Sequence, residues 1–328
     1  MKCAVIKKFG KEIENLVIEE REGLKAEECN VKVKIAATAL NRADLLQRRG
    51  LYPAPKDTVQ DIPGLEFSGV VDEVGEDVTL WKGGERVFGI ASGGTYAEEI
   101  VINEKLLMEI PDSLDLVEAA AVPEAFITAH DALRTQGNMS EGDIVLIHSA
   151  AGGVGSAAIQ IVNLFSATAI GTVGSKEKID KIKEYADFYA INYKESDFQE
   201  LIESKFGKSS VAVILDTVGA PYWQKNLSLL KKKGRLIVVG VMGGVKAETN
   251  LSLILSKRLH IIGTVLRSRP LEEKIDAVQK FSKEVLPHFN EGKLKPVIDS
   301  IYPFEKLYEA TRRMENNENS GKIILAFG

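Results

Sequence analysis

The stretch from Asp143 to Val162 constrains the fold of this chain more than any other. A run of aliphatic residues from Ile144 to Ile147 is followed by a glycine-rich turn, and apolar residues then recur with helical spacing from Ser156. A strand, a tight turn and a helix in this order are typical of a βαβ unit in a parallel sheet. An ordinary glycine turn before a helix is the alternative, but the flanking strand and helix together favour a nucleotide-binding turn.

The turn reads Ala150-Ala151-Gly152-Gly153-Val154-Gly155, an imperfect G-x-G-x-x-G fingerprint with alanine in its first position. The glycine at 152 lets the backbone approach a pyrophosphate, and the glycine at 155 lets the helix pack closely on the strand. Unpaired N–H groups in the first helical turn are suited to phosphate. The predicted cofactor contacts in this turn are Ala151, Gly152, Gly153 and Val154.

Bulk properties limit the classes of protein that fit. A chain of 328 residues is long enough for two domains. Its 42 basic residues are offset by 47 acidic ones, which argues against a nucleic-acid partner. The two cysteines are too few for a disulfide framework or a four-cysteine zinc lobe. Neither a signal-peptide pattern nor an apolar run long enough for a bilayer is visible, so we expect no membrane partner and a cytoplasmic protein.

Two rhythms divide the chain. Residues 1 to about 120 predict short strands around a helix that starts near Asn41, which suggests a β-barrel-like domain. Beyond about residue 125, strands and helices alternate, and six strands fit a doubly wound Rossmann sheet. The strands predicted in the first part are 31–35, 69–75, 85–90 and 96–101; those in the second part are 143–148, 168–173, 189–191, 211–216, 234–240 and 259–263. Lys231-Lys232-Lys233 is interpreted as a solvated helix end, and Asp216 as a helix cap rather than a catalytic group.

Several motifs together resemble one family. They are Asn-Arg-Ala-Asp-Leu-Leu-Gln-Arg-Arg-Gly-Leu-Tyr at 41–52, Gly-Leu-Glu-Phe at 64–67, Pro-Glu-Ala-Phe-Ile-Thr-Ala at 123–129, the glycine turn at 150–155, Ile-Asn-Tyr at 191–193 and Leu-Arg-Ser-Arg at 266–269. The chain resembles the zinc-free quinone oxidoreductase branch of the medium-chain dehydrogenase/reductase superfamily, and within it the tumour-suppressor-inducible quinone oxidoreductase group. The likeness runs nearly from end to end.

The resemblance implies a GroES-like β-barrel domain from residues 1–122 and 295–328, and a Rossmann NADPH-binding domain from 123–294. It also implies a homodimer, formed across the apolar segment 259–266 at the edge of the sheet. The zinc-dependent relatives place cysteine where Asn41 stands and histidine where Leu65 stands. We therefore expect no catalytic metal.

The implied activity is NADPH-dependent hydride transfer to a quinone or another electron-poor carbonyl compound, in the cleft between the domains. A quinone is a strong hydride acceptor and its reduced oxygen is a stable anion, so zinc is not required. Tyr52 and Asn41 are the predicted catalytic residues. Asn41 is also expected to contact the nicotinamide ribose or the substrate oxygen, and Tyr52 to donate a hydrogen bond to the reduced carbonyl. The remaining expected cofactor contacts are Thr128, Gly174, Ser175, Lys178, Tyr193, Val218, Gly240, Leu266, Arg267 and Asn319.

The preference for NADPH rests on the end of the second Rossmann strand. No carboxylate stands there to accept hydrogen bonds from a ribose 2′-hydroxyl; Gly174 and Ser175 follow instead. Lys178 and Tyr193 are placed to meet a 2′-phosphate, with Glu177 as the competing feature. Two other functions remain open: reduction of 2-alkenals or enoyl thioesters, and a cofactor-binding redox sensor or structural protein with little catalysis.

Overall fold

The structure is a computed structural model that describes residues 1–56 and 58–328. The chain forms two compact units, which we describe separately. The first contains Met1–Ile127 and Leu266–Gly328, and the second contains Thr128–Val265. Residues 266–294, which the sequence prediction placed with the nucleotide-binding portion, group with the first unit.

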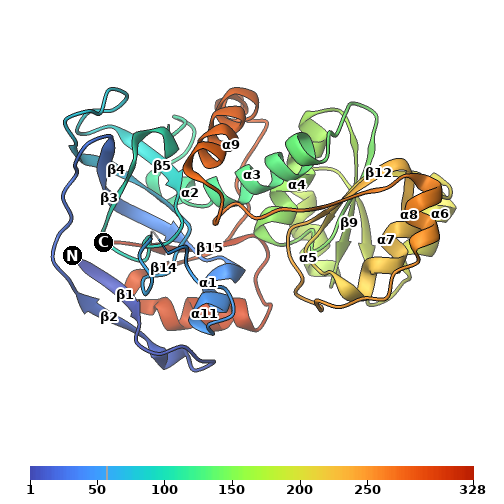
Figure 1. Cartoon of the computed structure of the whole chain (residues 1–328), viewed down its shortest axis with the longest axis horizontal. Helices are drawn as coiled ribbons and strands as arrows, with labels where there is room; N and C mark the ends of the chain where they lie inside the picture. The colour runs from blue at the N-terminus through green and yellow to red at the C-terminus, as the bar shows by residue number, and fades with distance from the viewer. Residues whose placement is uncertain (57) are drawn as a thin grey trace. The chain divides into compact units, whose positions relative to one another are not determined.

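A seven-stranded sheet organises the first unit, with the order β14-β15-β3-β4-β5-β7 and β6 paired to β3 (Figure 1). The strands of this sheet are β3 (Asn30–Ala39), β4 (Glu66–Val74), β5 (Arg86–Ile90), β6 (Glu99–Asn103), β7 (Leu107–Glu109), β14 (Ile298–Pro303) and β15 (Lys322–Ala326). Strands β1 (Lys2–Ile6) and β2 (Leu16–Glu20) form a separate antiparallel pair. Strand β6 begins three residues later than the sequence predicted.

The pairing of β3 decides what meets at its carboxyl end. On one side β15 runs antiparallel to it, with Ile324 opposite Ala39. On the other side β4 runs antiparallel, with Phe67 opposite Thr38. The C-terminal strand β15 thus belongs to the sheet of the first unit. The starts of β4 and β15 consequently flank the residues that follow β3.

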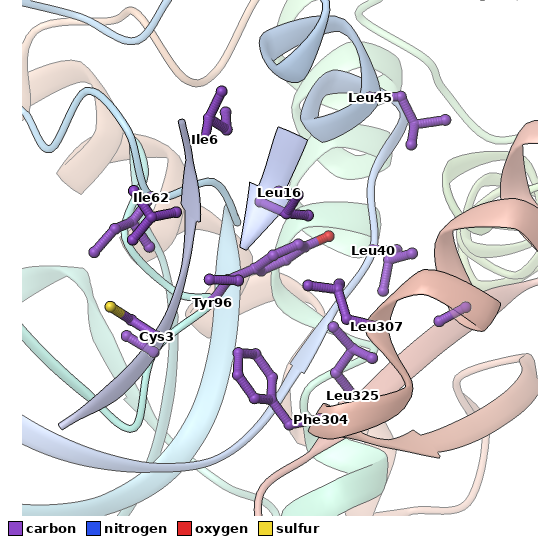
Figure 2. Close-up of a cluster of buried hydrophobic side chains, with 14 of the residues drawn as sticks. Cys3, Ile6, Leu16, Leu40, Leu45, Ile62, Tyr96, Phe304, Leu307 and Leu325 are labelled. Carbon is purple, nitrogen blue, oxygen red and sulfur yellow. The ribbon is translucent and has the colours of Figure 1, made fainter. Parts of the chain in front are cut away.

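One apolar cluster in the first unit joins the N-terminal pair of strands to the C-terminal segment. Figure 2 shows Tyr96 in the middle of this cluster, among side chains that include Cys3, Leu16, Leu40 and Leu307. The phenol of Tyr96 is only 2% exposed and donates a hydrogen bond to Asp44 Oδ2 at 3.0 Å. That bond satisfies the one polar atom that the ring carries into the core.

The helices of the first unit are α1 (Arg42–Arg48), α2 (Leu116–Ala119), α9 (Leu271–Glu284), α10 (Pro287–Asn290) and α11 (Leu307–Glu315). Helix α1 starts where the sequence predicted, with Asn41 as its N-cap residue. The Asp44 carboxylate accepts the Asn41 backbone N–H at 2.7 Å, which satisfies a donor that the helix itself leaves unpaired. Helix α3 (Pro123–His130) runs from the first unit into the second.

The second unit is a six-stranded parallel sheet with the order β10-β9-β8-β11-β12-β13. Its strands are β8 (Ile144–Ile147), β9 (Thr168–Val173), β10 (Tyr189–Asn192), β11 (Val211–Asp216), β12 (Leu230–Val238) and β13 (His260–Gly263), and its helices are α4 (Gly153–Leu164), α5 (Lys176–Lys183), α6 (Phe198–Phe206), α7 (Trp223–Leu229) and α8 (Leu251–Lys257). In Figure 1, α4 and α5 lie to one side of β9, and α6 and α7 lie to the other. This is the doubly wound Rossmann order 3-2-1-4-5-6, so the predicted fold class is confirmed.

The three lysines 231–233 do not end a helix, and that prediction is wrong. Helix α7 ends at Leu229 and β12 begins at Leu230, and both leucines are fully buried. The register of β12 on β11 then shifts, since Val211 pairs with Leu230 but Val213 pairs with Arg235. The extra residues, which include the lysines, form an exposed irregularity at the start of the strand.

Within the part of the chain that the structure describes, no helix combines the length and the apolar character needed to cross a membrane.

Candidate functional site

The turn between β8 and α4 has the geometry of a phosphate site. Gly152 is the N-cap of α4, no side chain caps the helix, and its first turn contains no acidic residue. A Cβ on Gly155 would lie 2.4 Å from the Ser149 carbonyl oxygen, so only glycine fits there. A Cβ on Gly152 would meet only that same oxygen, at 3.3 Å, which leaves the other side of the turn open to a ligand.

The alanine at the first fingerprint position is explained by a glycine on the next strand. Ala150 is fully buried, and its backbone N–H donates to the Thr172 carbonyl at 3.0 Å. A Cβ on Gly171 would lie 2.7 Å from the Ala150 Cβ. Ala150 is accommodated because β9 has glycine opposite it. The departure from the usual pattern therefore leaves the turn intact.

Most of the cofactor contacts predicted in the second unit lie at one edge of its sheet. They follow the carboxyl ends of five strands: Ala151, Gly152, Gly153 and Val154 after β8, Gly174, Ser175 and Lys178 after β9, Tyr193 after β10, Val218 after β11 and Gly240 after β12. The carboxyl edge is where open α/β sheets bind ligands. The structure thus brings together residues that are up to 89 positions apart in the sequence.

The end of β9 combines a hydroxyl, a lysine and a carboxylate. Ser175 is the N-cap of α5, and its Oγ accepts the Lys178 backbone N–H at 3.4 Å. A Cβ on Gly174 would lie 2.9 Å from the Tyr193 phenol oxygen, so Tyr193 lies directly over this glycine. The exposed Glu177 carboxylate is hydrogen-bonded to the Ser175 side chain, which lowers the pKa of Glu177. Glu177 is thus exposed and lies beside Ser175.

Hydrogen bonds among buried polar groups fix the carboxyl ends of β8 and β11. Asp216 Oδ1 accepts the backbone N–H groups of Val218 and Gly219, at 2.7 and 3.0 Å, so this residue stabilises the turn after β11. The predicted helix cap is wrong, because neither the short helix Ala220–Tyr222 nor α7 is capped by a side chain. The other carboxylate oxygen of Asp216 accepts Asn226 Nδ2 at 3.2 Å, and Asn226 Oδ1 lies 2.8 Å from His148 Nε2. Because an amide oxygen only accepts, His148 carries its proton on Nε2. Burial lowers the pKa of His148, which keeps the ring neutral.

Thr128 fits a ligand contact for a different reason. Its Oγ1 is buried and has no hydrogen-bond partner among the described residues. A buried hydroxyl without a partner costs free energy, and such groups are found where a ligand supplies the missing bond. Together with the uncapped start of α4, this atom fits the nucleotide cofactor that the turn predicts.

In the first unit, Asn41 is held by a buried ion pair. Lys322 Nζ lies 2.5 Å from Glu66 Oε1, and the side chains are 5% and 0% exposed. The same ammonium donates to Asn41 Oδ1 at 2.7 Å and to the Leu40 carbonyl at 2.9 Å, so each of its three protons has an acceptor. The Glu66 carboxylate also accepts Asn41 Nδ2 at 2.9 Å.

These contacts fix the orientation of the Asn41 amide. Its nitrogen donates to Glu66 Oε1 and, at 3.2 Å, to the Ala39 carbonyl, which uses both amide hydrogens. Its oxygen accepts from Lys322 and retains one lone pair. Asn41 is therefore equipped to accept a hydrogen bond, for example from a ribose hydroxyl. It would have to break a protein contact to donate one to a substrate oxygen.

Tyr52 is the other predicted catalytic residue. It is half-buried, and its hydroxyl makes no hydrogen bond to the described residues. Burial and then the nearby Glu124 raise the pKa of Tyr52 above 10. The phenol therefore keeps its proton near neutral pH and is available as a hydrogen-bond donor.

The other predicted residues of the first unit are occupied by protein contacts. The Arg267 guanidinium lies 5.2 Å from the Tyr52 ring and donates to Gln47 Oε1 at 2.6 Å and to the Ser92 carbonyl at 2.7 Å. Leu266 is buried, and Asn319 Nδ2 donates to the Gly321 carbonyl at 2.9 Å. Arg267 thus holds the Tyr52 segment in place.

Sequence reasoning missed Glu66, Lys322 and Glu124 as members of this group. Glu66 and Glu124 lie within motifs that carried the resemblance, but as single residues they showed no role. Lys322 gave no signal, because only the pairing of β15 with β3 brings it to Asn41.

The two positions compared with zinc ligands carry no metal-binding atoms of that kind. Asn41 is bound as described, and Leu65 is 2% exposed in the core. Among residues 1–56 and 58–328, no group of three or more histidine, cysteine, aspartate or glutamate side chains is arranged to hold a metal ion.

Comparisons with known proteins agree with the two-unit architecture. Residues 27–112 match the family described as alcohol dehydrogenase GroES-like domain, and residues 153–283 match the family described as zinc-binding dehydrogenase. Quinone oxidoreductase-like protein 2 of Bos taurus is 31% identical over 312 residues, covering 95% of this chain and 89% of that protein. The quinone oxidoreductase of Homo sapiens is 32% identical over 297 residues, covering 90% and 88% of the two chains.

Solved structures give the same result. The Escherichia coli quinone oxidoreductase complexed with NADPH superposes with a TM-score of 0.89 at 26% identity, covering 99% of this chain and 100% of the other. The CurK enoyl reductase superposes with a TM-score of 0.87 at 25% identity, covering 100% and 99%. The fold is that of an oxidoreductase with a GroES-like domain and a Rossmann domain. The chain belongs to the medium-chain dehydrogenase/reductase superfamily, in its quinone oxidoreductase branch.

Proposed function

We propose that the protein is an NADPH-dependent oxidoreductase that transfers a hydride to quinones without a metal ion. The observation that carries this proposal is the carboxyl edge of the second unit, where the uncapped α4 meets the open turn at Gly152. Beside it, β9 ends in Gly174 and Ser175 instead of a carboxylate. The human and bovine relatives and the E. coli structure that bears NADPH support the same reading.

Backbone and side-chain groups already described would hold the cofactor. The turn at 151–154 would bind the pyrophosphate through backbone N–H groups, and Thr128 Oγ1 would gain the partner that it lacks. Ser175, Lys178 and Tyr193 would surround the 2′-phosphate, and Asn41 Oδ1 would accept from a ribose hydroxyl. NADPH supplies the hydride when it is bound.

The acceptor would be positioned by the first unit. The free phenol of Tyr52 is suited to donate a hydrogen bond to the carbonyl oxygen that gains negative charge. Arg267 lies over the Tyr52 ring and keeps it in place. A quinone needs little more than this, because its reduced oxygen is a stabilised anion.

Reduction of 2-alkenals or enoyl thioesters is the second candidate, favoured by the likeness to the CurK enoyl reductase. A cofactor-binding protein with little catalysis is the third. The deciding experiment is NADPH consumption against a graded series of quinones, with 2-alkenals in parallel. Quinone turnover that survives exhaustive chelation is expected. Activity that is lost on chelation and restored specifically by zinc would contradict the metal-free assignment, and NADPH binding without turnover would favour the third candidate.

A further inference from the structure

Glu124 is a half-buried carboxyl group beside the residues that hold Asn41. It is the second residue of α3, and its backbone N–H donates to Glu66 Oε2 at 2.8 Å. Its own carboxyl oxygens make no hydrogen bond to the described residues, whereas Glu66 and Asp44 are bound by several donors. A shielded carboxyl group without a partner has no evident structural role.

The charges around Glu124 favour its neutral form. Burial and then the Glu66 carboxylate raise the pKa of Glu124 to about 8, and Asp44 acts in the same direction. Lys322 and Arg267 oppose the shift. These groups belong to β4, β15, α1 and the segment after β13, so the neighbourhood of Glu124 is set by tertiary structure. At neutral pH the group is mostly a carboxylic acid.

The pKa of Glu124 lies closer to neutral pH than the pKa of Tyr52, with which Glu124 interacts electrostatically. The most effective general acid has a pKa close to the working pH. The pKa of Tyr52 is raised above 10, so its phenol holds its proton more firmly than the carboxylic acid does. Tyr52 is thus suited to hydrogen bonding, and Glu124 to proton transfer.

The helix adds a second geometric argument. Glu124 and Thr128 are four residues apart in α3, so their side chains share one face about 5–6 Å apart at Cβ. Thr128 Oγ1 is buried and has no partner within residues 1–56 and 58–328. Two polar groups that the protein leaves unsatisfied therefore stand one turn apart on one helix.

We propose that Glu124 delivers the proton to the reduced acceptor, an assignment that rests on the proposed function. The acceptor takes two electrons with the hydride and becomes an anion, while the reduced nicotinamide is oxidised. The O–H bond of Glu124 breaks, and a new bond forms between that proton and the anion, at oxygen for a hydroquinone. Glu124 is left as a carboxylate, which Arg267 and Lys322 stabilise until water returns a proton.

Glu124→Gln tests the proposal, because it keeps the shape of the side chain and removes the exchangeable acid. In the parent, kcat should fall above pH 8 as Glu124 ionises. In Glu124→Gln that dependence should be absent, and kcat at neutral pH should fall about a hundredfold, the lower end of what general acid catalysis contributes. Glu109→Gln, an exposed position in β7, is the matched control and should behave as the parent.

A measurement without substrate or cofactor complements the kinetics. Infrared spectra of the parent should contain the carbonyl stretch of a carboxylic acid at pH 7 that titrates away near pH 8 and is missing in Glu124→Gln. Glu124→Asp is the second variant and should retain both the band and the alkaline fall in kcat. No turnover of any acceptor by the parent would defeat the proposed function. Turnover by Glu124→Gln with an unchanged alkaline limb, or a parent without the band, would defeat the Glu124 assignment alone.

Discussion

Lys322 and Glu66 form a buried ion pair with 2.5 Å between Nζ and Oε1, and neither residue was singled out by its sequence context. The pair places one positive charge next to Asn41, at the position where zinc-dependent members of the superfamily carry a cysteine ligand. Every proton of the ammonium is matched by an acceptor. The pair thereby fixes the face that Asn41 presents to a ligand.

Removing the ammonium should be costly. Lys322→Met leaves the Glu66 carboxylate buried and unpaired, and breaking such a pair costs about 3–5 kcal/mol of unfolding free energy. Lys322→Met combined with Glu66→Gln should recover part of this loss, because the buried charge is gone. Lys2→Met is the control, since Lys2 and Glu305 form a pair at 2.7 Å that is largely exposed, and no measurable change is expected. Urea unfolding of the parent and the three variants decides this, and equal losses at Lys322 and Lys2 would contradict it.

The fold was predictable because each strand of the second unit carries its own pattern. Strand β8, the turn and α4 were recognised from local spacing alone. The errors occurred where tertiary contacts override local pattern: Lys231-Lys232-Lys233 has the composition of a helix end, but buried Leu229 and Leu230 force the chain into β12.

The site was only partly predictable for the same reason. Residues within a motif, such as Asn41 and Gly152, are identified by their neighbours in the sequence. Lys322 reaches Asn41 only through the antiparallel pairing of β15 with β3, across 281 positions. Glu124 acquires its raised pKa from burial and from the carboxylates of Glu66 and Asp44, which lie on β4 and α1. Neither property is encoded locally.

Tyr52 and Asn41 should respond differently to truncation. Tyr52→Phe removes a hydroxyl that has no hydrogen-bond partner among the described residues, so the fold should be unaffected. If the hydroxyl only orients the acceptor, the activation free energy for kcat/KM should rise by about 1 kcal/mol. If it stabilises the developing oxyanion, the rise should approach 3 kcal/mol, roughly a hundredfold in rate. Asn41→Ala should also lower the melting temperature, because Lys322 and Glu66 each lose a partner. Parent-like kinetics of both variants on several quinones would remove both residues from the site.

His148 should make stability depend on pH. Burial lowers the pKa of His148 in the folded protein, so the unfolded chain binds a proton first as the pH falls. The contribution of neutral His148 to the unfolding free energy is complete above about pH 6.5, the ordinary pKa of histidine. It declines below that pH by up to 1.4 kcal/mol per pH unit. Unfolding free energies at pH 7.5 and 5.5 should therefore differ more in the parent than in His148→Gln. An equal decline in both proteins would rule out His148 as a source.

The homodimer expected from the resemblance can be tested at the sheet edge. Strand β13 ends the strand order of its sheet and pairs only with β12 among the described strands. Ile261 is 37% exposed there and Val265 is 47% exposed. We expect a dimer by light scattering at micromolar concentration and a monomer for Ile261→Lys, because a lysine on an edge strand opposes pairing. Leu80→Lys, at an exposed apolar residue of the first unit, should leave the mass unchanged. A monomeric parent would contradict the prediction.

The preference for NADPH over NADH depends on the balance between Lys178 and Glu177 at the end of β9. A charge-assisted contact contributes about 1.5–3 kcal/mol, so Lys178→Ala should weaken NADPH binding by roughly ten- to a hundredfold and leave NADH nearly unchanged. Lys176 is close in sequence and would reduce the effect if it replaced Lys178. The Glu177 carboxylate holds the Ser175 hydroxyl and would repel a 2′-phosphate. Glu177→Gln should therefore increase the affinity for NADPH and leave the affinity for NADH unchanged or lower.

Titration of both cofactors into the parent and the two variants measures this balance. The variants act in opposite directions on NADPH, so a general loss of folding cannot produce the expected pattern. Lys283→Ala, at a lysine of α9 in the first unit, is the charge-matched control and should change neither affinity. Equal affinity of the parent for NADH and NADPH would defeat the assignment, since a site that binds the 2′-phosphate through Lys178 and Tyr193 must distinguish the two cofactors.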